Sequence, residues 1–291
     1  MRVLRVRRPG WGARCLRRRV RPPPLLGHPP PYRRCARKEA AVPDSPSSRH
    51  RISVRTAVVW AALQAELDSR AADGPLAVLD AGGGTGGFAV PLAQLGHQVT
   101  VVDPSPDSLA ALGRRAAEAG VCDWVHARQG DLATLPEVVA PGSCDLVLCH
   151  SVLEVVEDPA AALGQAAAAM RAGGCISVLA ANRTAVVFSR ALVGHFTEAR
   201  HALDDPAGRW GAGDGAVRRF ALADLTALLD EVGLVVEAVH GVRTFTELVA
   251  GHLLDSDPAA LAHLAELELA VADRPAFREV ATQLHVLARR P

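Results

Sequence analysis

Five glycines within the six residues 82–87 constrain this chain more than any other feature. They follow a short apolar run, 77–79, that is typical of a buried strand and ends at Asp80. After the glycines, residues 88–95 have helical apolar spacing and stop at Gly96, and residues 98–102 alternate as a second strand that ends at Asp103. A turn with almost no side chains lets backbone N–H groups contact a ligand directly. The order strand, glycine turn, helix and strand predicts the first half of a doubly wound nucleotide-binding sheet.

The glycine spacing fits two nucleotides. Gly82, Gly84 and Gly87 match a dinucleotide fingerprint, and Asp103 lies about 20 residues on, where an acid would bind a ribose hydroxyl. The same stretch also begins with an acid, Asp80, at the end of the first strand. A carboxylate there would repel the pyrophosphate of NAD, whereas it suits S-adenosylmethionine, which carries an ammonium and no phosphate. We favour S-adenosylmethionine; NAD, and a tight turn without any ligand, are the alternatives.

The rest of the chain alternates strands and helices at the spacing of a parallel sheet with helices on both faces. The predicted fold is an α/β, doubly wound, Rossmann-like sheet of seven strands, with residues 283–288 as the final strand at the sheet edge. Residues 184–215 lack a sheet rhythm, and a loop of that length is usually functional or mobile. The other predicted strands are 124–127, 146–149, 175–180 and 234–239, and the other predicted helices are 56–67, 107–118, 159–170, 220–232, 245–254 and 258–270.

Charge divides the chain in two. Residues 1–53 contain 15 of the 32 lysines and arginines but only two of the 31 acidic residues, whereas residues 54–291 hold 17 basic and 29 acidic side chains. The first segment is proline-rich and cannot build a core, so we expect a disordered extension. It could be a nucleic-acid arm or a transit peptide; we favour a start near Val54, with the extension not native. Scattered cysteines without C-x-x-C pairs and no apolar run of membrane-spanning length predict a cytoplasmic protein with no membrane partner.

The stretch from Asp80 to Gly86 resembles the first motif of class I S-adenosylmethionine-dependent methyltransferases. Two further stretches, 128–131 and 170–175, resemble later motifs of that family in the same order. From about Arg55 to Pro291 the chain is similar to the bacterial tRNA methyltransferases that esterify 5-carboxymethoxyuridine at the anticodon wobble position. The matching pieces are Arg55 with Trp60, 79–84, 96–99, 150–154, Asp158-Pro159, Asn182, 241–245, 266–268 and 285–289.

This resemblance implies a class I fold with its last strand antiparallel, over residues 54–291, and a substrate-covering insertion around 182–219. It implies cofactor contacts at Arg55, Asp80, Gly82, Gly83, Gly84, Asp103, Gln129, Asp131 and His150. Arg55 would pair with the cofactor carboxylate and His150 would lie beside the sulfonium; the structural alternatives are a surface arginine and a core histidine.

Asn182 and Arg243 are the candidates for substrate binding, with a structural ion pair as the alternative for Arg243. The resemblance implies tRNA as the acceptor. An acidic folded part repels polyanions, however, so a small-molecule carboxylate is the rival substrate. A carboxylate acceptor is ionised at neutral pH and needs no general base, so we expect no catalytic acid–base residue and no metal.

Overall fold

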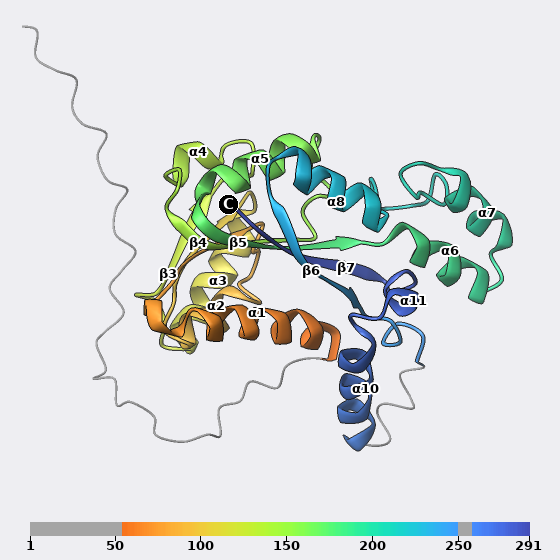
Figure 1. Cartoon of the computed structure of the whole chain (residues 1–291), viewed down its shortest axis with the longest axis horizontal. Coiled ribbons are helices and arrows are strands. Elements are labelled where there is room, and N and C mark those ends of the chain that lie inside the picture. Colours follow the sequence, from red (N-terminus) through yellow and green to blue (C-terminus); the bar gives the residue numbers. More distant parts are fainter. Residues whose placement is uncertain (1–53, 250–257) are drawn as a thin grey trace, which may run out of the picture. The chain divides into compact units, whose positions relative to one another are not determined.

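The computed structural model of the chain describes residues 54–249 and 258–291. The predicted extension over residues 1–53 lies outside the described residues, as does the second half of the helix predicted for residues 245–254. Residues 245–249 form turns. The described residues form one mixed sheet with helices against both of its faces (Figure 1).

The sheet has seven strands in the order β3-β2-β1-β4-β5-β7-β6. The first five in the sequence pair in parallel, and β7 runs antiparallel to both β5 and β6, which confirms the predicted fold class. The strands are β1 (Ala77–Ala81), β2 (Gln98–Asp103), β3 (Val125–Gln129), β4 (Cys144–His150), β5 (Met170–Ala181), β6 (Val235–Val242) and β7 (Gln283–Arg289).

The predicted place of the last strand at the sheet edge was wrong. β7 lies between β5 and β6, and β6 is the edge strand. Burial explains the difference, because six of the seven residues of β7 are buried in succession whereas the first residues of β6 alternate between exposed and half-buried. The polar Gln283 and His285 are buried with the apolar residues of β7, so the polar–apolar alternation in its sequence does not mark an exposed face or a sheet edge.

Alternate residues of each strand serve two separate cores. Val78 faces a core with apolar residues of α1 (Ala57–Ser69), α2 (Ala89–Gln94) and α3 (Pro106–Glu118). Leu79 faces the other, with α4 (Leu135–Val138), α5 (Pro159–Ala169) and α8 (Leu222–Glu231). This division follows from the two-residue period of a strand. The remaining helical segments are η1 (Val54–Thr56), η2 (Ala71–Asp73), α6 (Arg183–Leu192), α7 (Phe196–Asp204), α10 (Pro258–Val271) and α11 (Pro275–Arg278).

The stretch predicted as a loop, 184–215, contains the two helices α6 and α7, which extend beyond the end of β5 (Figure 1). Asn182 caps α6, because its side-chain oxygen accepts a hydrogen bond from the Thr184 N–H at 3.0 Å. Of the α6 residues only Val186 is buried, and Phe188 and Leu192 are 50% and 66% exposed. The apolar residues lie mainly on one side of α6, although little of that side is buried among the described residues. The helical period is therefore present in the sequence, and the loop prediction overlooked it.

A second difference concerns the glycine pair at 173–174. A glycine pair just after a predicted helix, here 159–170, is typical of a helix end, but α5 ends at Ala169 and the pair lies within β5. A side chain at Gly174 would place its Cβ 2.8 Å from the Arg171 carbonyl oxygen. The glycine is therefore required by close backbone packing rather than by a helix end.

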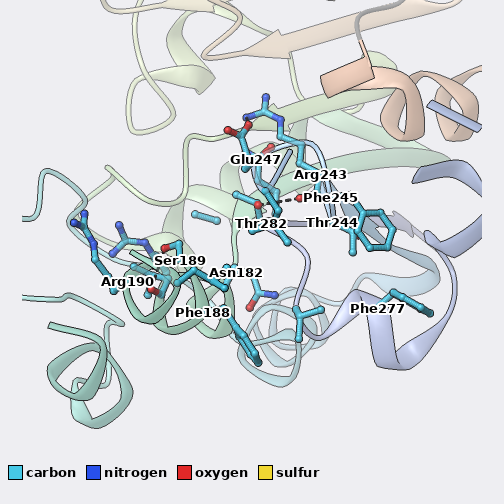
Figure 2. A pocket seen from close by; sticks show the side chains of 18 of the residues that line it. Asn182, Phe188, Ser189, Arg190, Arg243, Thr244, Phe245, Glu247, Phe277 and Thr282 are labelled. Carbon is cyan, nitrogen blue, oxygen red and sulfur yellow. Dashed lines mark hydrogen bonds and ion pairs between the residues drawn. The ribbon is translucent and has the colours of Figure 1, made fainter. Parts of the chain in front are cut away.

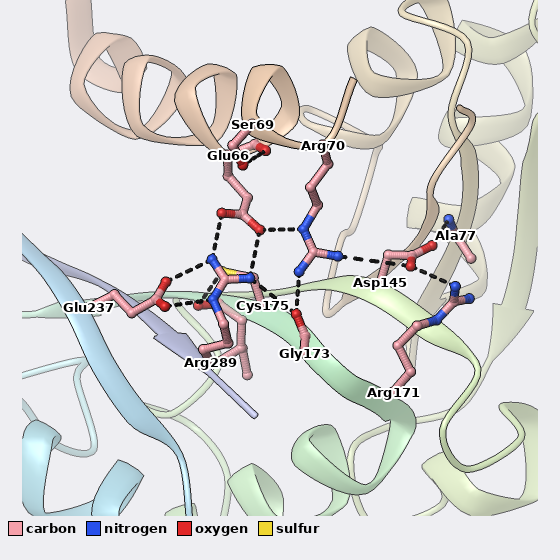
Figure 3. A network of polar contacts seen from close by, with 11 residues as sticks. Glu66, Ser69, Arg70, Ala77, Asp145, Arg171, Gly173, Cys175, Glu237 and Arg289 are labelled. Atoms are coloured by element: carbon pink, nitrogen blue, oxygen red, sulfur yellow. Dashed lines mark hydrogen bonds and ion pairs between the residues drawn. The ribbon is translucent and has the colours of Figure 1, made fainter. Parts of the chain in front are cut away.

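A network of charged side chains joins α1 to the sheet at the edge where the parallel strands begin (Figure 3). Glu66, 7% exposed, accepts hydrogen bonds from Arg70 at 2.7 Å and from Arg289 at 2.8 Å. Arg289 also pairs with Glu237 of β6 at 2.6 Å. The network thereby fixes the end of β7 against both α1 and β6, away from the glycine turn.

Candidate functional site

Most of the predicted site residues meet at one edge of the sheet. β1, β2, β3 and β4 are parallel, so Asp80, Asp103, Gln129 and His150 all lie at or next to the carboxyl ends of their strands. In an open α/β sheet the ligand binds at this edge. β6 is antiparallel to β7 and thus ends at the same edge, which brings in Arg243.

Several positions of the turn after β1 require glycine. Gly82 and Gly84 have φ angles of +75° and +55°, in the left-handed region. A Cβ on Gly82 would lie 2.4 Å from Cγ2 of Val152, and one on Gly83 would lie 2.4 Å from the carboxylate of Asp80. At Gly84 the nearest other atom is 3.8 Å away. The turn thus presents bare backbone around one carboxylate.

Asp80 is a buried acid poised for a cationic partner. Its side chain is 3% exposed, and its Oδ2 atom has no hydrogen-bond partner among the described residues. Burial, with a smaller contribution from Asp103, raises the pKa of Asp80 to about 7. An ammonium group placed against Oδ2 would satisfy it, so the site fits the amino-acid part of S-adenosylmethionine better than a pyrophosphate.

Asp103 ties the second strand to the glycine turn. Its Oδ2 accepts a hydrogen bond from the Gly84 N–H and its Oδ1 accepts one from the Ser105 N–H, both at 2.9 Å. Each carboxylate oxygen keeps a further lone pair. The carboxylate is therefore held in place while it can still accept hydrogen bonds from a ribose.

Gln129 is the last residue of β3 and Asp131 lies two residues further on; both are exposed. The Gln129 amide donates to the Pro104 carbonyl oxygen at 3.4 Å. Asp131 accepts from the N–H and the hydroxyl of Thr134, each at 2.9 Å, and these bonds to Thr134 lower the pKa of Asp131. Asp131 therefore stabilises the turn formed by residues 131–134.

His150 packs against aromatic rings beside the turn. The ring of Phe88 meets it edge-on at 4.7 Å between centroids, and Phe88 in turn stacks on Trp60 at 5.1 Å. His150 Nε2 lies 2.8 Å from the hydroxyl of Ser177, whereas its Nδ1 is buried with no partner in the described part of the chain. Burial lowers the pKa of His150 to about 3, so the ring is neutral at pH 7.

Next to these residues lies a cavity of about 780 Å³ between α6 and the segment after β6. Figure 2 shows Arg243 and Glu247 at one side of it and Phe188, Ser189 and Arg190 of α6 at another. Its lining includes four arginines and one glutamate: Arg55, Arg190, Arg219, Arg243 and Glu247. Arg190 is paired with Glu198 at 3.2 Å and Arg219 with Asp214 at 2.7 Å. An excess of positive charge would therefore come from Arg55 and Arg243, which both contact Glu247, and it would favour an anionic ligand.

Arg55 and Arg243 lie together at this cavity. Arg55 contacts Glu247 at 3.3 Å, and Arg243 Nε donates to the Arg55 carbonyl oxygen at 3.3 Å. Arg243 Nη1 is 3.8 Å from Glu247, beyond hydrogen-bond distance. The structure therefore places Arg55 with the substrate-side candidate Arg243 at this cavity.

Asn182 also lines the cavity, but its amide is occupied. Besides capping α6, it donates to the carbonyl oxygens of Glu279 and Ala281, at 3.0 and 2.8 Å. It is 3% exposed. These contacts place it as a support for α6 and the segment before β7.

Two residues that sequence reasoning did not select also shape the site. Glu268 of α10, fully buried, accepts hydrogen bonds from the N–H groups of Thr244, Phe245 and Thr246 at 2.8 to 2.9 Å, and thereby fixes the turn that follows Arg243. Gln283 lines the cavity and donates to the hydroxyl of Ser151, next to His150, at 3.3 Å. Gln283 therefore connects the cavity to the glycine-turn cluster. For Glu268, nothing in the sequence of α10 distinguishes an acid that fixes a distant turn from an ordinary acid of a helix.

Comparison with known proteins agrees with this geometry. A family model described as a methyltransferase domain matches residues 79–178, from β1 into β5. The chain is 29% identical over 243 residues to the tRNA 5-carboxymethoxyuridine methyltransferase of Escherichia coli, covering 82% of this chain and 88% of the relative. The chain is a class I S-adenosylmethionine-dependent methyltransferase. The residues matched by the family model, 79–178, include the glycine turn, Asp103 and His150.

Other methyltransferases are similar over less of the chain or at lower identity. A ubiquinone biosynthesis O-methyltransferase of Methylocella silvestris is 35% identical over 177 residues, covering 57% of this methyltransferase and 64% of the relative. The fold resembles that of magnesium protoporphyrin IX methyltransferase from Synechocystis, with a TM-score of 0.53 at 18% identity over 82% of this chain and 86% of that chain.

No helix in residues 54–249 and 258–291 has both the length and the apolar character needed to cross a membrane. Within the same residues, no group of three or more histidine, cysteine or acidic side chains is arranged to hold a metal ion.

Proposed function

We propose that this methyltransferase transfers a methyl group to the carboxylate of 5-carboxymethoxyuridine in tRNA. The observation that carries the proposal is the similarity to the Escherichia coli enzyme of that name, which extends over 82% of this chain and 88% of the relative. That similarity extends well beyond residues 79–178, the part matched by the general methyltransferase family.

We propose that the glycine turn and its neighbours hold the cofactor. Asp80 would pair with the ammonium group, the backbone of Gly82, Gly83 and Gly84 would lie along the amino-acid part, and Asp103 would accept the ribose hydroxyls. The remaining cofactor candidates are Arg55 for the carboxylate, Gln129 and Asp131 for the adenine rim, and His150 beside the sulfonium. When bound, S-adenosylmethionine supplies a methyl group activated by its positive sulfur.

The acceptor would enter the cavity, where Arg243 is the proposed carboxylate ligand. Its guanidinium is only partly engaged by Glu247, at 3.8 Å, and a planar guanidinium matches a carboxylate with two parallel hydrogen bonds. Glu268 holds the backbone that carries it. Asn182 would contribute indirectly, by anchoring α6 along the cavity.

Methyl transfer to a carboxylate requires that the two reactants be correctly positioned, and it requires no acid–base residue. A carboxylate is ionised at neutral pH, and no proton has to leave when it accepts a methyl group. The protein therefore has to align two reactants and exclude water. Phe88 and Trp60 shield the region near His150 from solvent.

A small-molecule carboxylate is the second candidate acceptor. Residues 54–291 carry 29 acidic against 17 basic side chains, and affinity for tRNA rests largely on neutralised phosphates. Moreover, three nearby arginines are paired with acids within the protein: Arg200 with Asp204, Arg209 with Asp205, and the cavity-lining Arg219 with Asp214.

The deciding experiment uses cofactor labelled in the methyl group. The protein is incubated with tRNA that contains 5-carboxymethoxyuridine, with tRNA that lacks it, and with a small-molecule extract. We expect label only in the first tRNA, released by mild alkali as a methyl ester should be. The R243A variant should lose this transfer yet still bind S-adenosylhomocysteine in calorimetry. Label confined to the small-molecule fraction would refute the tRNA assignment and leave the enzyme class intact.

A further inference from the structure

Four polar side chains on neighbouring strands form a continuous hydrogen-bonded line through the sheet. His150 Nε2 lies 2.8 Å from the Ser177 hydroxyl, which lies 2.8 Å from His285 Nε2. His285 Nδ1 then lies 3.1 Å from Nδ1 of His240. The four residues belong to β4, β5, β7 and β6, in the order in which these strands lie in the sheet. Ser177 and His285 are fully buried.

Each contact in this line needs one proton. Two N–H groups that face each other repel, and two facing lone pairs leave both buried acceptors without a hydrogen bond. Each neutral ring therefore carries one N–H donor and one acceptor nitrogen. Both nitrogens of His285 are engaged, and the serine hydroxyl can donate to only one ring. When the Ser177 hydroxyl donates to one of its two neighbouring rings, the tautomer of any one member fixes those of all the others.

All three rings are uncharged at neutral pH. Burial lowers the pKa of His150 to about 3 and holds that of His285 well below its usual value. Burial also lowers the pKa of His240, where Asp273 favours the charged form and Arg278 opposes it. Two arrangements of neutral tautomers use every proton of the line, and they differ in whether His150 Nδ1 carries a proton. A third, in which Ser177 accepts from both neighbouring rings, leaves the buried hydroxyl proton without a place in the line and is disfavoured.

The neighbourhood of His150 selects between them. Its Nδ1 is buried without a partner among the described residues, and the ring lies beside the glycine turn through its contact with Phe88. If the cofactor binds as proposed above, a positive sulfonium lies near this ring. A bare lone pair on an uncharged ring is favourable beside a cation, whereas an N–H group pointed at it is not.

We infer that Ser177, His285 and His240 are positioning residues that hold His150 as the neutral tautomer protonated on Nε2, with an unprotonated Nδ1 left for the methyl-donor site. In this arrangement His150 Nε2–H donates to Ser177, the Ser177 hydroxyl donates to His285 Nε2, and His285 Nδ1–H donates to His240. His240 keeps its proton on Nε2. The inference concerns the same site as the proposed function and rests on its cofactor position.

The tautomers can be read directly in the wild-type protein without any ligand. Nitrogen-15 NMR of histidine-labelled protein separates protonated from bare ring nitrogens, and the signals are assigned through the H150Q and H240Q variants. We expect the alternating pattern Nε2–H for His150, Nδ1–H for His285 and Nε2–H for His240. A proton on Nδ1 of His150, or a mixture of tautomers, overturns the inference.

Binding tests the consequence. The S177A variant removes the link between His150 and His285, and we expect its affinity for S-adenosylmethionine to fall by roughly tenfold, the size of one hydrogen bond. Its affinity for S-adenosylhomocysteine, which lacks the positive charge, should change much less. The S69A variant, whose hydroxyl binds only the backbone of α1 in this structure, should alter neither. Equal losses for both ligands would mean that Ser177 merely supports the fold, which contradicts the inference.

The two proposals fail in different ways. If wild-type protein binds neither compound, the proposed cofactor position is wrong. If it binds both but the tautomers do not alternate as described, the positioning line is wrong and the function stands.

Discussion

Replacing Asp80 by asparagine tests the central feature of the site, a buried carboxylate that awaits a cation. The D80N variant keeps the size of the side chain and removes its charge. Asp80 is 3% exposed, and its pKa is raised from an ordinary value of 3.8 to about 7 by burial and by Asp103. Without ligand the variant should therefore be more stable than the wild type, although it changes a functional residue.

The magnitude follows from linkage. Between pH 4 and 7 the folded protein binds this proton more tightly than the unfolded chain does, so the stability contributed by Asp80 falls as pH rises through that range. A shift of about three pKa units corresponds to about 4 kcal/mol, which is a large part of the stability of a domain. The D80N variant should exceed the wild type by about 1.5 kcal/mol at pH 5 and by about 4 kcal/mol at pH 8.

Urea unfolding at pH 5 and pH 8 measures this difference. His150 contributes in the opposite direction, because its lowered pKa of about 3 makes stability rise with pH up to about 6.5, but it is present in both proteins and cancels. The D107N variant, which alters an exposed acid on α3, should behave as the wild type. Adding S-adenosylmethionine should stabilise the wild type and not D80N. If both proteins lose the same stability between the two pH values, Asp80 is not the buried acid described here.

Three further substitutions test other parts of the structure. G83A should abolish cofactor binding in calorimetry, because its Cβ would lie 2.4 Å from the buried carboxylate, whereas G87A, with no atom within 4 Å of the added group, should bind; equal affinity of the two would contradict the geometry of the turn. E268Q should speed amide hydrogen exchange in the turn at 244–246 and lower kcat/KM for the acceptor, without changing affinity for S-adenosylhomocysteine. R289M should lose about 2–3 kcal/mol in urea unfolding, because it removes one of the two arginines that pair with the buried Glu66, against less than about 0.5 kcal/mol for the exposed pair removed in R200M.

The glycine turn made the first half of the fold predictable. Local backbone geometry determines the residue type at positions such as Gly82, whose φ is left-handed. Asp80 and Asp103 lie at the ends of strands with a clear apolar pattern. Parallel pairing then brings the strand ends together without further information. These features explain why the cofactor candidates gather at one edge.

The substrate side could not be predicted in the same way. The order of β7 and β6 depends on pairing between residues far apart in the chain. The case of α6 is different, because its amphipathic period is present in the sequence and the loop prediction overlooked it. The role of Glu268 is set by backbone groups more than 20 residues away, as its bonds to residues 244–246 show. Contacts of that kind leave no periodic trace in a sequence.

The central position of β7 has a consequence for how the domain assembles. β6 pairs only with β7 within the sheet, although it precedes β7 by about 40 residues in the chain. It can therefore join the sheet only through β7. Closing that long loop carries an entropic cost before any pairing is gained. The edge that carries Arg243 and His240 should be the last to become ordered during folding, and any change that weakens β7 should release it first.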